Sequence, residues 1–300
     1  MPLFIPAEQT LNYTIQNILL RDTATLSEKL ALEASSARIE VQCLLQQVLQ
    51  VQRVYLLAHA ERVLTDAEYA AYAALLQRRV AGEPVAYILG QREFYGLNFA
   101  VTSATLIPRP DTELLVELAL QRLPQREPGT VLDLGTGSGA IALAIAHERP
   151  QVQVLACDAS AAALAVAQHN AKALQLANVV FVRSNWFAAL AAQRFDVIVS
   201  NPPYIAAADP HLALGDVRFE PLSALASGVD GLDDIRQIVA QAHSHLQPGG
   251  WLLLEHGYDQ AAQVRHLLQQ AGFAEVYSAC DLAGIERVSG GRLDAPATTL

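Results

Sequence analysis

The chain has 300 residues, of which 52% are hydrophobic and 17% are charged, and its formal net charge is −10. These proportions are normal for a folded soluble protein that can bury a core without disulfides or metals. The negative charge argues against a general binder of nucleic acid or of membrane surfaces, because such proteins usually carry a basic face.

The cysteines and the start of the chain indicate the compartment. Three cysteines are scattered through the sequence, without metal-ligand spacing or a disulfide pattern. The stretch MPLFIPAEQT lacks the basic and apolar regions of a signal peptide, and no uncharged apolar run approaches the ~18 residues of a membrane span. The sequence therefore predicts a cytoplasmic protein with no metal, no membrane partner and no direct nucleic-acid partner.

Residues 1–90 are predicted to form an all-α helical bundle domain. Apolar side chains recur there at helical spacing, as in Ile15, Ile18 and Leu19. The stretch Thr65–Glu68 has the pattern of a capping box, in which the two end residues satisfy backbone amides at the start of a helix. Four or five short helices of this kind would pack around a core of their own.

Residues 91–108 have a different character, with many β-branched and aromatic side chains around Gly96. This composition predicts a short hairpin or an irregular linker between two domains. Asp111 and Thr112 can then cap a helix that runs to about Leu123.

The remaining domain, residues 109–300, alternates short apolar runs with helical segments. Strands are expected at 130–135, 153–158, 179–183, 195–201, 251–256, 275–279 and 284–290, and helices at 139–148, 160–174, 231–246 and 259–271. This alternation is typical of an α/β fold with a mostly parallel sheet that helices cover on both faces. Ligands of such sheets bind at the carboxyl ends of the strands, near the point where the strand order reverses.

The strongest local signal is a glycine-rich loop between the first strand and the first helix of this domain. The loop consists of Gly135, Thr136, Gly137, Ser138 and Gly139. With Ala140 it satisfies the weaker form of a dinucleotide fingerprint. With Asp133 it resembles the D/E-x-G-x-G-x-G loop with which class I methyltransferases bind S-adenosylmethionine. Asp133 favours the second interpretation, because a carboxylate attracts the ammonium group of that cofactor and repels a pyrophosphate.

Two further positions at strand ends are suited to a nucleoside. Asp158 ends the second strand, where an acid can hold the two ribose hydroxyls of either cofactor class. Asn185 and Trp186 follow the third strand and offer an amide and a flat ring that could lie against an adenine. Packing in the core explains Trp186 equally well, because large aromatic side chains are usually buried.

The fourth strand ends at Ser200, and the sequence then reads Asn-Pro-Pro-Tyr. Asn201 supplies a side-chain carbonyl, Pro202 supplies a backbone carbonyl, and Pro203 stiffens the turn. Two acceptors beside the Tyr204 ring suit a planar –NH₂ group, since each acceptor takes one N–H. Holding that poor nucleophile in line with a methyl group supplies rate by proximity, and acceptors near the developing charge add electrostatic stabilisation.

Four stretches together resemble the PrmC/HemK family of protein-(glutamine-N5) methyltransferases. They are GEPVAYILG (82–90), IPRPDTE (107–113), LDLGTGSGAIAL (132–143) and NPPYI (201–205). The resemblance extends from about residue 15 to 290. Two positions differ from the family pattern: Asp111 stands where glutamate is usual, and Asn185 where aspartate is common.

The resemblance implies a class I methyltransferase domain with a Rossmann-like seven-stranded sheet. It also implies a reaction, methyl transfer from S-adenosylmethionine to the glutamine in the GGQ motif of class 1 peptide chain release factors, which modulates translation termination. The helical domain would help to bind the release factor. The glycine loop with Asp158, Trp186 and Asn201 would contact the cofactor, and residues 201–204 would hold the glutamine.

Two alternatives share part of this pattern. An adenine-N6 methyltransferase would use the same –NH₂ chemistry, but it would need a basic track for phosphates. The first ninety residues carry seven Lys and Arg against nine Asp and Glu, and the remainder thirteen against twenty-one. A non-catalytic adaptor would not need an intact glycine loop and an intact NPPY turn. The long segment Val217 to Arg236 could be a lid or a plain connection.

Overall fold

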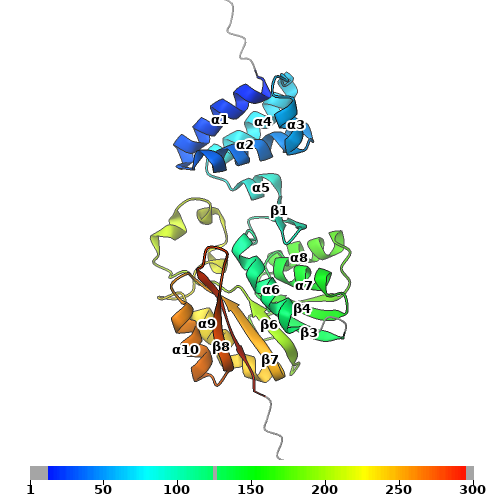
Figure 1. The fold of residues 1–300 in the computed structure, drawn as a ribbon, viewed down its shortest axis with the longest axis vertical. Coiled ribbons are helices and arrows are strands. Elements are labelled where there is room, and N and C mark those ends of the chain that lie inside the picture. The colour runs from blue at the N-terminus through cyan, green and yellow to red at the C-terminus, as the bar shows by residue number, and fades with distance from the viewer. Residues whose placement is uncertain (1–12, 124–126, 295–300) are drawn as a thin grey trace, which may run out of the picture. The chain divides into compact units, whose positions relative to one another are not determined.

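The computed structural model describes residues 13–123 and 127–294. The outermost residues of the two predicted domains, 1–12 and 295–300, lie outside the described residues, as do 124–126. The chain divides into two compact units, with the boundary between Leu89 and Gly90. Figure 1 colours the helical first unit blue to cyan and the larger α/β unit green to red.

The named elements of the first unit are all helices, and one isolated β-bridge joins Thr14 to Val63. Its helices are α1 Ile15–Leu30, α2 Ala34–Leu49, α3 Arg53–Ala58, α4 Asp66–Val80 and α5 Val85–Leu89. The predicted capping box is present, because Thr65 Oγ1 accepts from the Glu68 amide while the Glu68 carboxylate accepts from the Thr65 amide. Apolar faces of all five helices, with leucines predominating, form one buried cluster.

The second unit begins with a β-hairpin of β1 Gln91–Phe94 and β2 Leu97–Ala100. Tyr95 and Gly96 both have positive φ, as a two-residue hairpin turn requires. Phe94 and Phe99 are buried in the core cluster of this unit. The hairpin is therefore packed as a part of the α/β unit.

A helix follows the hairpin, but it does not begin with the expected cap. A 3-10 turn, η1 Pro110–Thr112, precedes α6 Glu113–Arg122. Thr112 has helical backbone angles and makes no side-chain cap, whereas an N-cap residue needs an extended backbone to reach the free amides. Its hydroxyl bonds instead to Asn201.

The core of the second unit is a seven-stranded sheet in the order β5-β4-β3-β6-β7-β9-β8. The strands are β3 Gly129–Leu134, β4 Val152–Asp158, β5 Val179–Arg183, β6 Phe195–Ser200, β7 Leu246–Glu255, β8 Ala274–Cys280 and β9 Glu286–Arg292. Neighbours from β5 to β7 pair in parallel, and β9 pairs antiparallel to both β7 and β8. This arrangement confirms the predicted mostly parallel, seven-stranded sheet.

Helices and short 3-10 turns complete the unit (Figure 1). They are α7 Ala140–Glu148, α8 Ala161–Ala173, α9 Asp233–Ala242 and α10 Ala261–Gln270, with η2 Pro210–Ala213, η3 Val217–Phe219, η4 Leu222–Ala224 and η5 His243–His245. Successive strand residues alternate between two apolar clusters, so that Val131 packs with α6 and α7 while Leu132 packs with α9 and α10. The sheet is thus covered on both faces.

The strand order reverses between β3 and β6, because the chain builds β4 and β5 on one side of β3 and then crosses to the other. Leu134 and Ser200 pair in register at the carboxyl end of these two strands. The Ser200 hydroxyl also donates to the Leu134 carbonyl over 2.7 Å. The glycine loop and the Asn-Pro-Pro-Tyr turn therefore leave the sheet side by side, at the point where open α/β sheets bind ligands.

Candidate active site

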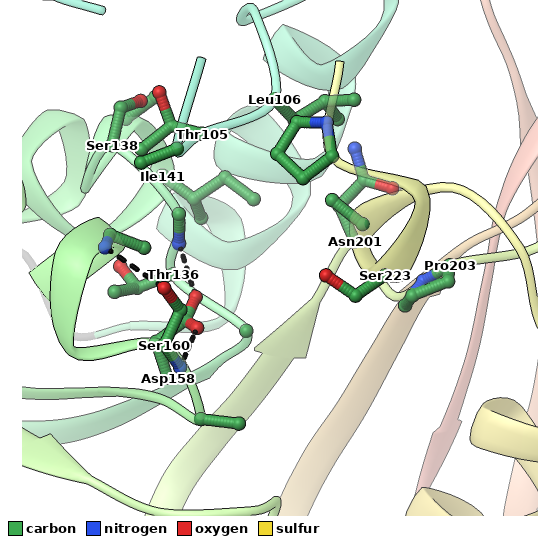
Figure 2. A pocket seen from close by; sticks show the side chains of 18 of the residues that line it. Thr105, Leu106, Thr136, Ser138, Ile141, Asp158, Ser160, Asn201, Pro203 and Ser223 are labelled. Atoms are coloured by element: carbon green, nitrogen blue, oxygen red, sulfur yellow. Dashed lines mark hydrogen bonds between the residues drawn. The ribbon is translucent and has the colours of Figure 1, made fainter. Parts of the chain in front are cut away.

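A cavity of about 440 Å³ opens at this point of the second unit. Its walls come from the loops after β3, β4, β5 and β6 and from the segments 104–112 and 221–224. Asn201, Pro203 and Ser223 lie on one side of it in Figure 2, and Thr136 and Asp158 lie on the other. The cavity thus brings together the two motifs that the sequence singled out.

The glycine loop forms one wall, to which Gly135, Thr136, Gly137 and Ser138 contribute while Gly139 does not. Gly135 has a φ of +74°, and a Cβ on it would lie 3.3 Å from Cζ3 of the Trp186 ring. Gly139 has a φ of +85°, and a Cβ there would lie 3.0 Å from a Leu143 methyl group. Both positions combine a left-handed backbone with a close neighbour, so that a side chain would distort the loop.

Asp133 lies beneath this loop and is not part of the cavity wall. Its side chain is fully buried, and its Oδ2 accepts a 2.6 Å hydrogen bond from the Thr136 hydroxyl. Burial raises the pKa of this carboxyl to about 7. The contact gives Asp133 a clear role in holding the loop, and its attraction for a ligand's ammonium group stays a prediction.

Asp158 reaches the cavity from the end of β4 and also fixes the loop. Its Oδ2 accepts from the Gly137 amide at 2.9 Å, and its Oδ1 accepts from the Ser160 amide at 2.8 Å (Figure 2). The carboxylate is therefore held at the cavity wall by two backbone donors. Further lone pairs on its oxygens are available for hydroxyl groups of a ligand.

Trp186 lines the cavity and also packs against the apolar cluster of α9 and α10. The packing interpretation of this residue is therefore supported, and its contact with an adenine stays a prediction. Its Nε1–H donates to Asp234 Oδ1 over 3.1 Å, which holds the indole ring at a fixed angle beside the loop. Asp234 also lines the cavity. This partner could not be predicted from local patterns, since it lies 48 positions away at the start of α9.

The Asn-Pro-Pro-Tyr turn contributes Asn201 and Pro203 to the cavity wall, but neither Pro202 nor Tyr204. Asn201 Nδ2 donates to Thr112 Oγ1 over 3.2 Å. Among the described residues, none donates a hydrogen bond to Asn201 Oδ1, so this acceptor is available to a ligand.

Two hydrogen bonds at the backbone of Tyr204 also hold the turn. The Tyr204 amide donates to the Leu225 carbonyl, and its own carbonyl accepts from Gln260 Nε2 over 2.9 Å. Burial raises the pKa of the Tyr204 hydroxyl, so that the phenol stays neutral. The ring is therefore a fixed apolar group and is not a base.

Glu220 joins two walls of the cavity. Its side chain is completely buried, and its carboxylate accepts from the Ile107 amide over 2.9 Å and from the Arg109 guanidinium. Burial raises the pKa of Glu220, against the attraction of Arg109. The segment 217–224 is thereby bonded to the segment 105–109, and both segments contribute residues to the cavity wall.

Sequence reasoning missed Thr112, Glu220 and Asp234, because each acquires its role through a partner far along the chain. A weak signal did exist for Arg109, which stands between two prolines at the start of the second domain. Across the described ranges, no group of three or more His, Cys, Asp and Glu side chains could hold a metal ion. Nor is any helix in those ranges long and apolar enough to cross a membrane.

Comparisons with known proteins agree with this geometry. Residues 111–219 match the family model of the methyltransferase small domain, and residues 23–90 match that of the PrmC N-terminal domain. The release factor glutamine methyltransferase of Pseudomonas aeruginosa is 54% identical over 87% of this chain and 94% of its own length. That of Burkholderia pseudomallei is 55% identical over 87% of this chain and 93% of its own length.

A solved structure gives the same fold at low sequence identity. A methyltransferase from Pyrococcus furiosus superposes with a TM-score of 0.52 and 19% identity, over 75% of this chain and all of the other. The alignments with the two release factor glutamine methyltransferases span nearly the whole length of those proteins and include both units of this chain. The chain therefore belongs to the release factor glutamine methyltransferase family.

Proposed function

We propose that this methyltransferase transfers a methyl group from S-adenosylmethionine to the side-chain amide nitrogen, N5, of the glutamine in the GGQ motif of class 1 peptide chain release factors. The observation that carries the proposal is the position of Asn201. Its free side-chain carbonyl lines the same cavity as the glycine loop, at the reversal point of a methyltransferase sheet. The names of the close relatives support the release factor as the substrate.

The residues of the cavity fit the cofactor. A volume of about 440 Å³ lies in the range of small-molecule sites. Asp158 offers a carboxylate for the two ribose hydroxyls, and the glycine loop offers close backbone approach. The Trp186 ring gives a flat apolar surface for an adenine. When bound, S-adenosylmethionine supplies an electrophilic methyl group on its sulfur.

The substrate amide would be oriented by the turn after β6. Asn201 Oδ1 accepts one N–H of the glutamine –NH₂ group. The Pro202 backbone carbonyl is the predicted acceptor for the other N–H, although Pro202 does not line the cavity as the structure describes it. Pro203 restricts the turn, and Tyr204 is bonded at both its amide and its carbonyl, so the two acceptors stay in place. Holding the nitrogen in line with the methyl group supplies rate by proximity.

The same acceptors stabilise the charge that develops on the nitrogen. As the new C–N bond forms, the nitrogen becomes positively charged, and carbonyl oxygens already aimed at its protons lower the energy of that state. The nitrogen also becomes acidic at this stage, so its proton can leave without a strong base. This is consistent with a Tyr204 hydroxyl whose pKa is raised and which therefore does not accept a proton.

The helical unit is proposed to contact the release factor. It matches the PrmC N-terminal domain, and it exposes several large apolar side chains. Two of them, Leu20 and Leu57, are 59% and 56% exposed and line a shallow pocket of about 330 Å³. Exposed apolar side chains beside a pocket are typical of protein-binding surfaces.

Labelled S-adenosylmethionine tests this function. The protein is incubated with a class 1 release factor, with the same factor carrying GGQ glutamine→alanine, or with DNA. We expect label on the first substrate only. Label on DNA would instead support an adenine-N6 methyltransferase, label that survives the glutamine change would place the reaction on another residue, and no label on any substrate would support an adaptor.

A further inference from the structure

A buried acidic residue lies beside Asn201 at the carboxyl end of two neighbouring inner strands of the sheet. Glu255 is the last residue of β7, and its side chain is only 2% exposed. Leu254 pairs in register with Ser200 of β6, so the next residues of the two strands, Glu255 and Asn201, leave the sheet together. The carboxylate therefore lies behind the turn that the proposed function assigns to the substrate.

Two side chains of the site influence this carboxylate. Burial, the largest effect, and the charge of Asp111 raise the pKa of Glu255 to about 7, against the neighbouring Thr112, Arg287 and Asn201, which favour its ionised form. Its Oε2 is buried and has no hydrogen-bond partner among the described residues. An ionised carboxylate can only accept hydrogen bonds, so the groups that face it must be donors.

The need for donors that face the carboxylate sets the direction of the hydrogen bonds around Thr112. Thr112 Oγ1 already accepts from Asn201 Nδ2 at 3.2 Å, which leaves its own proton free to be donated. Glu255 is the nearby acidic acceptor whose ionised form Thr112 favours. An Asn201 amide turned by 180° would direct its carbonyl oxygen toward the carboxylate, where two acceptors repel each other.

We propose that Glu255 is a positioning residue for methyl transfer, which acts with Thr112 to fix the orientation of the Asn201 amide. The –NH₂ of Asn201 is held toward Thr112 and Glu255, so that Oδ1 is presented to the substrate. In the opposite orientation, Asn201 would present N–H donors to the N–H donors of the glutamine, and the substrate would lose one acceptor. This inference rests on the proposed function, because it explains how one substrate acceptor of that site, Asn201 Oδ1, is oriented.

The burial of an acid at this position is in keeping with such a role. A buried carboxylate with an unpartnered oxygen costs stability compared with an apolar or amide side chain of similar size. Among the described residues Glu255 forms no salt bridge, and the attraction of the Arg287 charge offsets only part of this cost. Glu255 orients the neighbouring Asn201 amide. Buried acidic groups with shifted pKa values are concentrated at functional sites.

The test compares kcat at saturating release factor and cofactor with the dissociation constant for cofactor alone. Glu255→Gln can donate as well as accept, so it no longer favours one orientation of Asn201. We expect kcat to fall by about tenfold or more, since small misplacements of a reacting group cost up to ~10²-fold. Binding of S-adenosylmethionine, measured by calorimetry, is expected to stay within about twofold, because Glu255 does not line the cavity.

Thr112 provides a second and independent pair of variants. Thr112→Val removes the hydroxyl and is expected to lower kcat like Glu255→Gln, whereas Thr112→Ser keeps the hydroxyl and should retain most of the activity. The double variant Thr112→Val with Glu255→Gln should be no worse than the more impaired single variant, because both changes break one network. A residue that only packs would not give rescue by serine.

Thr130→Val is the matched control. Thr130 also bonds a carboxylate through its hydroxyl, Asp196 at 2.9 Å, but it lies at the opposite end of the sheet, near the start of β3. Its kcat should equal that of the wild type. The proposal is overturned if Glu255→Gln keeps the wild-type kcat, if its loss is due wholly to weaker cofactor binding, or if Thr112→Ser is as impaired as Thr112→Val.

The outcomes separate this inference from the proposed function. If wild-type protein does not methylate release factor, the proposed function fails. If wild type is active and the variants of Glu255 and Thr112 are equally active, only the positioning role fails. Should Glu255→Gln not fold, as judged by thermal unfolding, the serine and valine variants of Thr112 decide the matter.

Discussion

The side-chain amide of Asn201 donates a hydrogen bond to Thr112 across 3.2 Å, which joins the turn after β6 to the 3-10 turn that precedes α6. The two residues are 89 positions apart in the chain. The bond engages the amide nitrogen of Asn201 and leaves its carbonyl oxygen free of described donors at the cavity wall. The orientation of this amide is central to the proposed chemistry.

Replacing Asn201 with alanine should lower methyl transfer by about 10² to 10³-fold, the usual effect of losing one preorganised group that stabilises developing charge. Cofactor affinity should fall much less, because Asp158 and the glycine loop remain. Single-turnover rates and calorimetry measure the two effects separately. Asn98→Ala, on the exposed face of β2, is a suitable control. Near-normal turnover by Asn201→Ala would show that the acceptor mechanism is wrong.

Glu220→Gln should loosen the segment 217–224 from the segment 105–109, since a neutral amide cannot replace the carboxylate that accepts from both Ile107 and Arg109. We expect faster dissociation of S-adenosylmethionine, by several-fold, and faster proteolysis within 210–232. Stopped-flow dissociation and limited proteolysis measure these changes. Glu275→Gln breaks an exposed pair with Arg292, where little effect is expected. Equal dissociation rates for the two variants would leave 217–224 as a plain connection.

Leu57→Glu should weaken the proposed contact between the helical unit and the release factor. A charge in the shallow pocket beside Leu20 opposes burial of this surface, so we expect a rise in KM for release factor of about tenfold. The dissociation constant for the cofactor should not change. Leu282→Glu, at a fully exposed leucine in the second unit, is the control. An unaltered KM in Leu57→Glu would exclude this pocket from the interface.

The packing of the hairpin predicts where the chain can be divided. A fragment 90–300 should fold and bind cofactor while methylating release factor poorly. A fragment 109–300 should be less stable by several kcal/mol, because it lacks Phe94 and Phe99, which are both buried in the core of this unit. It also removes the backbone that bonds Asn170 at Ala100. Urea unfolding compares the two fragments, and equal midpoints would contradict this account of the hairpin.

The sequence predicted those features that depend on local patterns. Strand ends are readable from apolar runs, so the glycine loop, Asp158 and Asn201 could be assigned to one crevice before the structure was known. Distant partners could not be read in this way. Thr112 seemed suited to a helix cap, but its hydroxyl bonds to a residue 89 positions away. Local patterns also cannot tell whether a strand-end acid such as Asp133 faces the cavity or supports the loop from below.

Two buried carboxyls make stability depend on pH. Burial raises the pKa of Asp133 and of Glu255 to about 7 in the folded protein, whereas unfolded carboxyls titrate near ~4. Between these values the folded state binds more protons than the unfolded state, so stability present at low pH is lost as the pH rises toward 7. Each group should contribute a decline on the order of 3 kcal/mol.

Asp133→Asn and Glu255→Gln should each remove one part of this decline. The free energy of unfolding of each variant minus that of the wild type should therefore become more positive as the pH increases. Urea titrations of both proteins from pH 4.5 to 8 measure this difference. A constant difference between variant and wild type over this range would show that the replaced carboxyl does not titrate there.

Mass spectrometry of a release factor after incubation with this protein and S-adenosylmethionine tests the central claim most directly. With wild-type protein, the GGQ peptide should gain the mass of one methyl group, and fragmentation should assign it to the glutamine side chain. With Asn201→Ala, the same peptide should stay unmodified over the same time. A methyl group on any other residue, or an equal yield from the two proteins, would contradict the account.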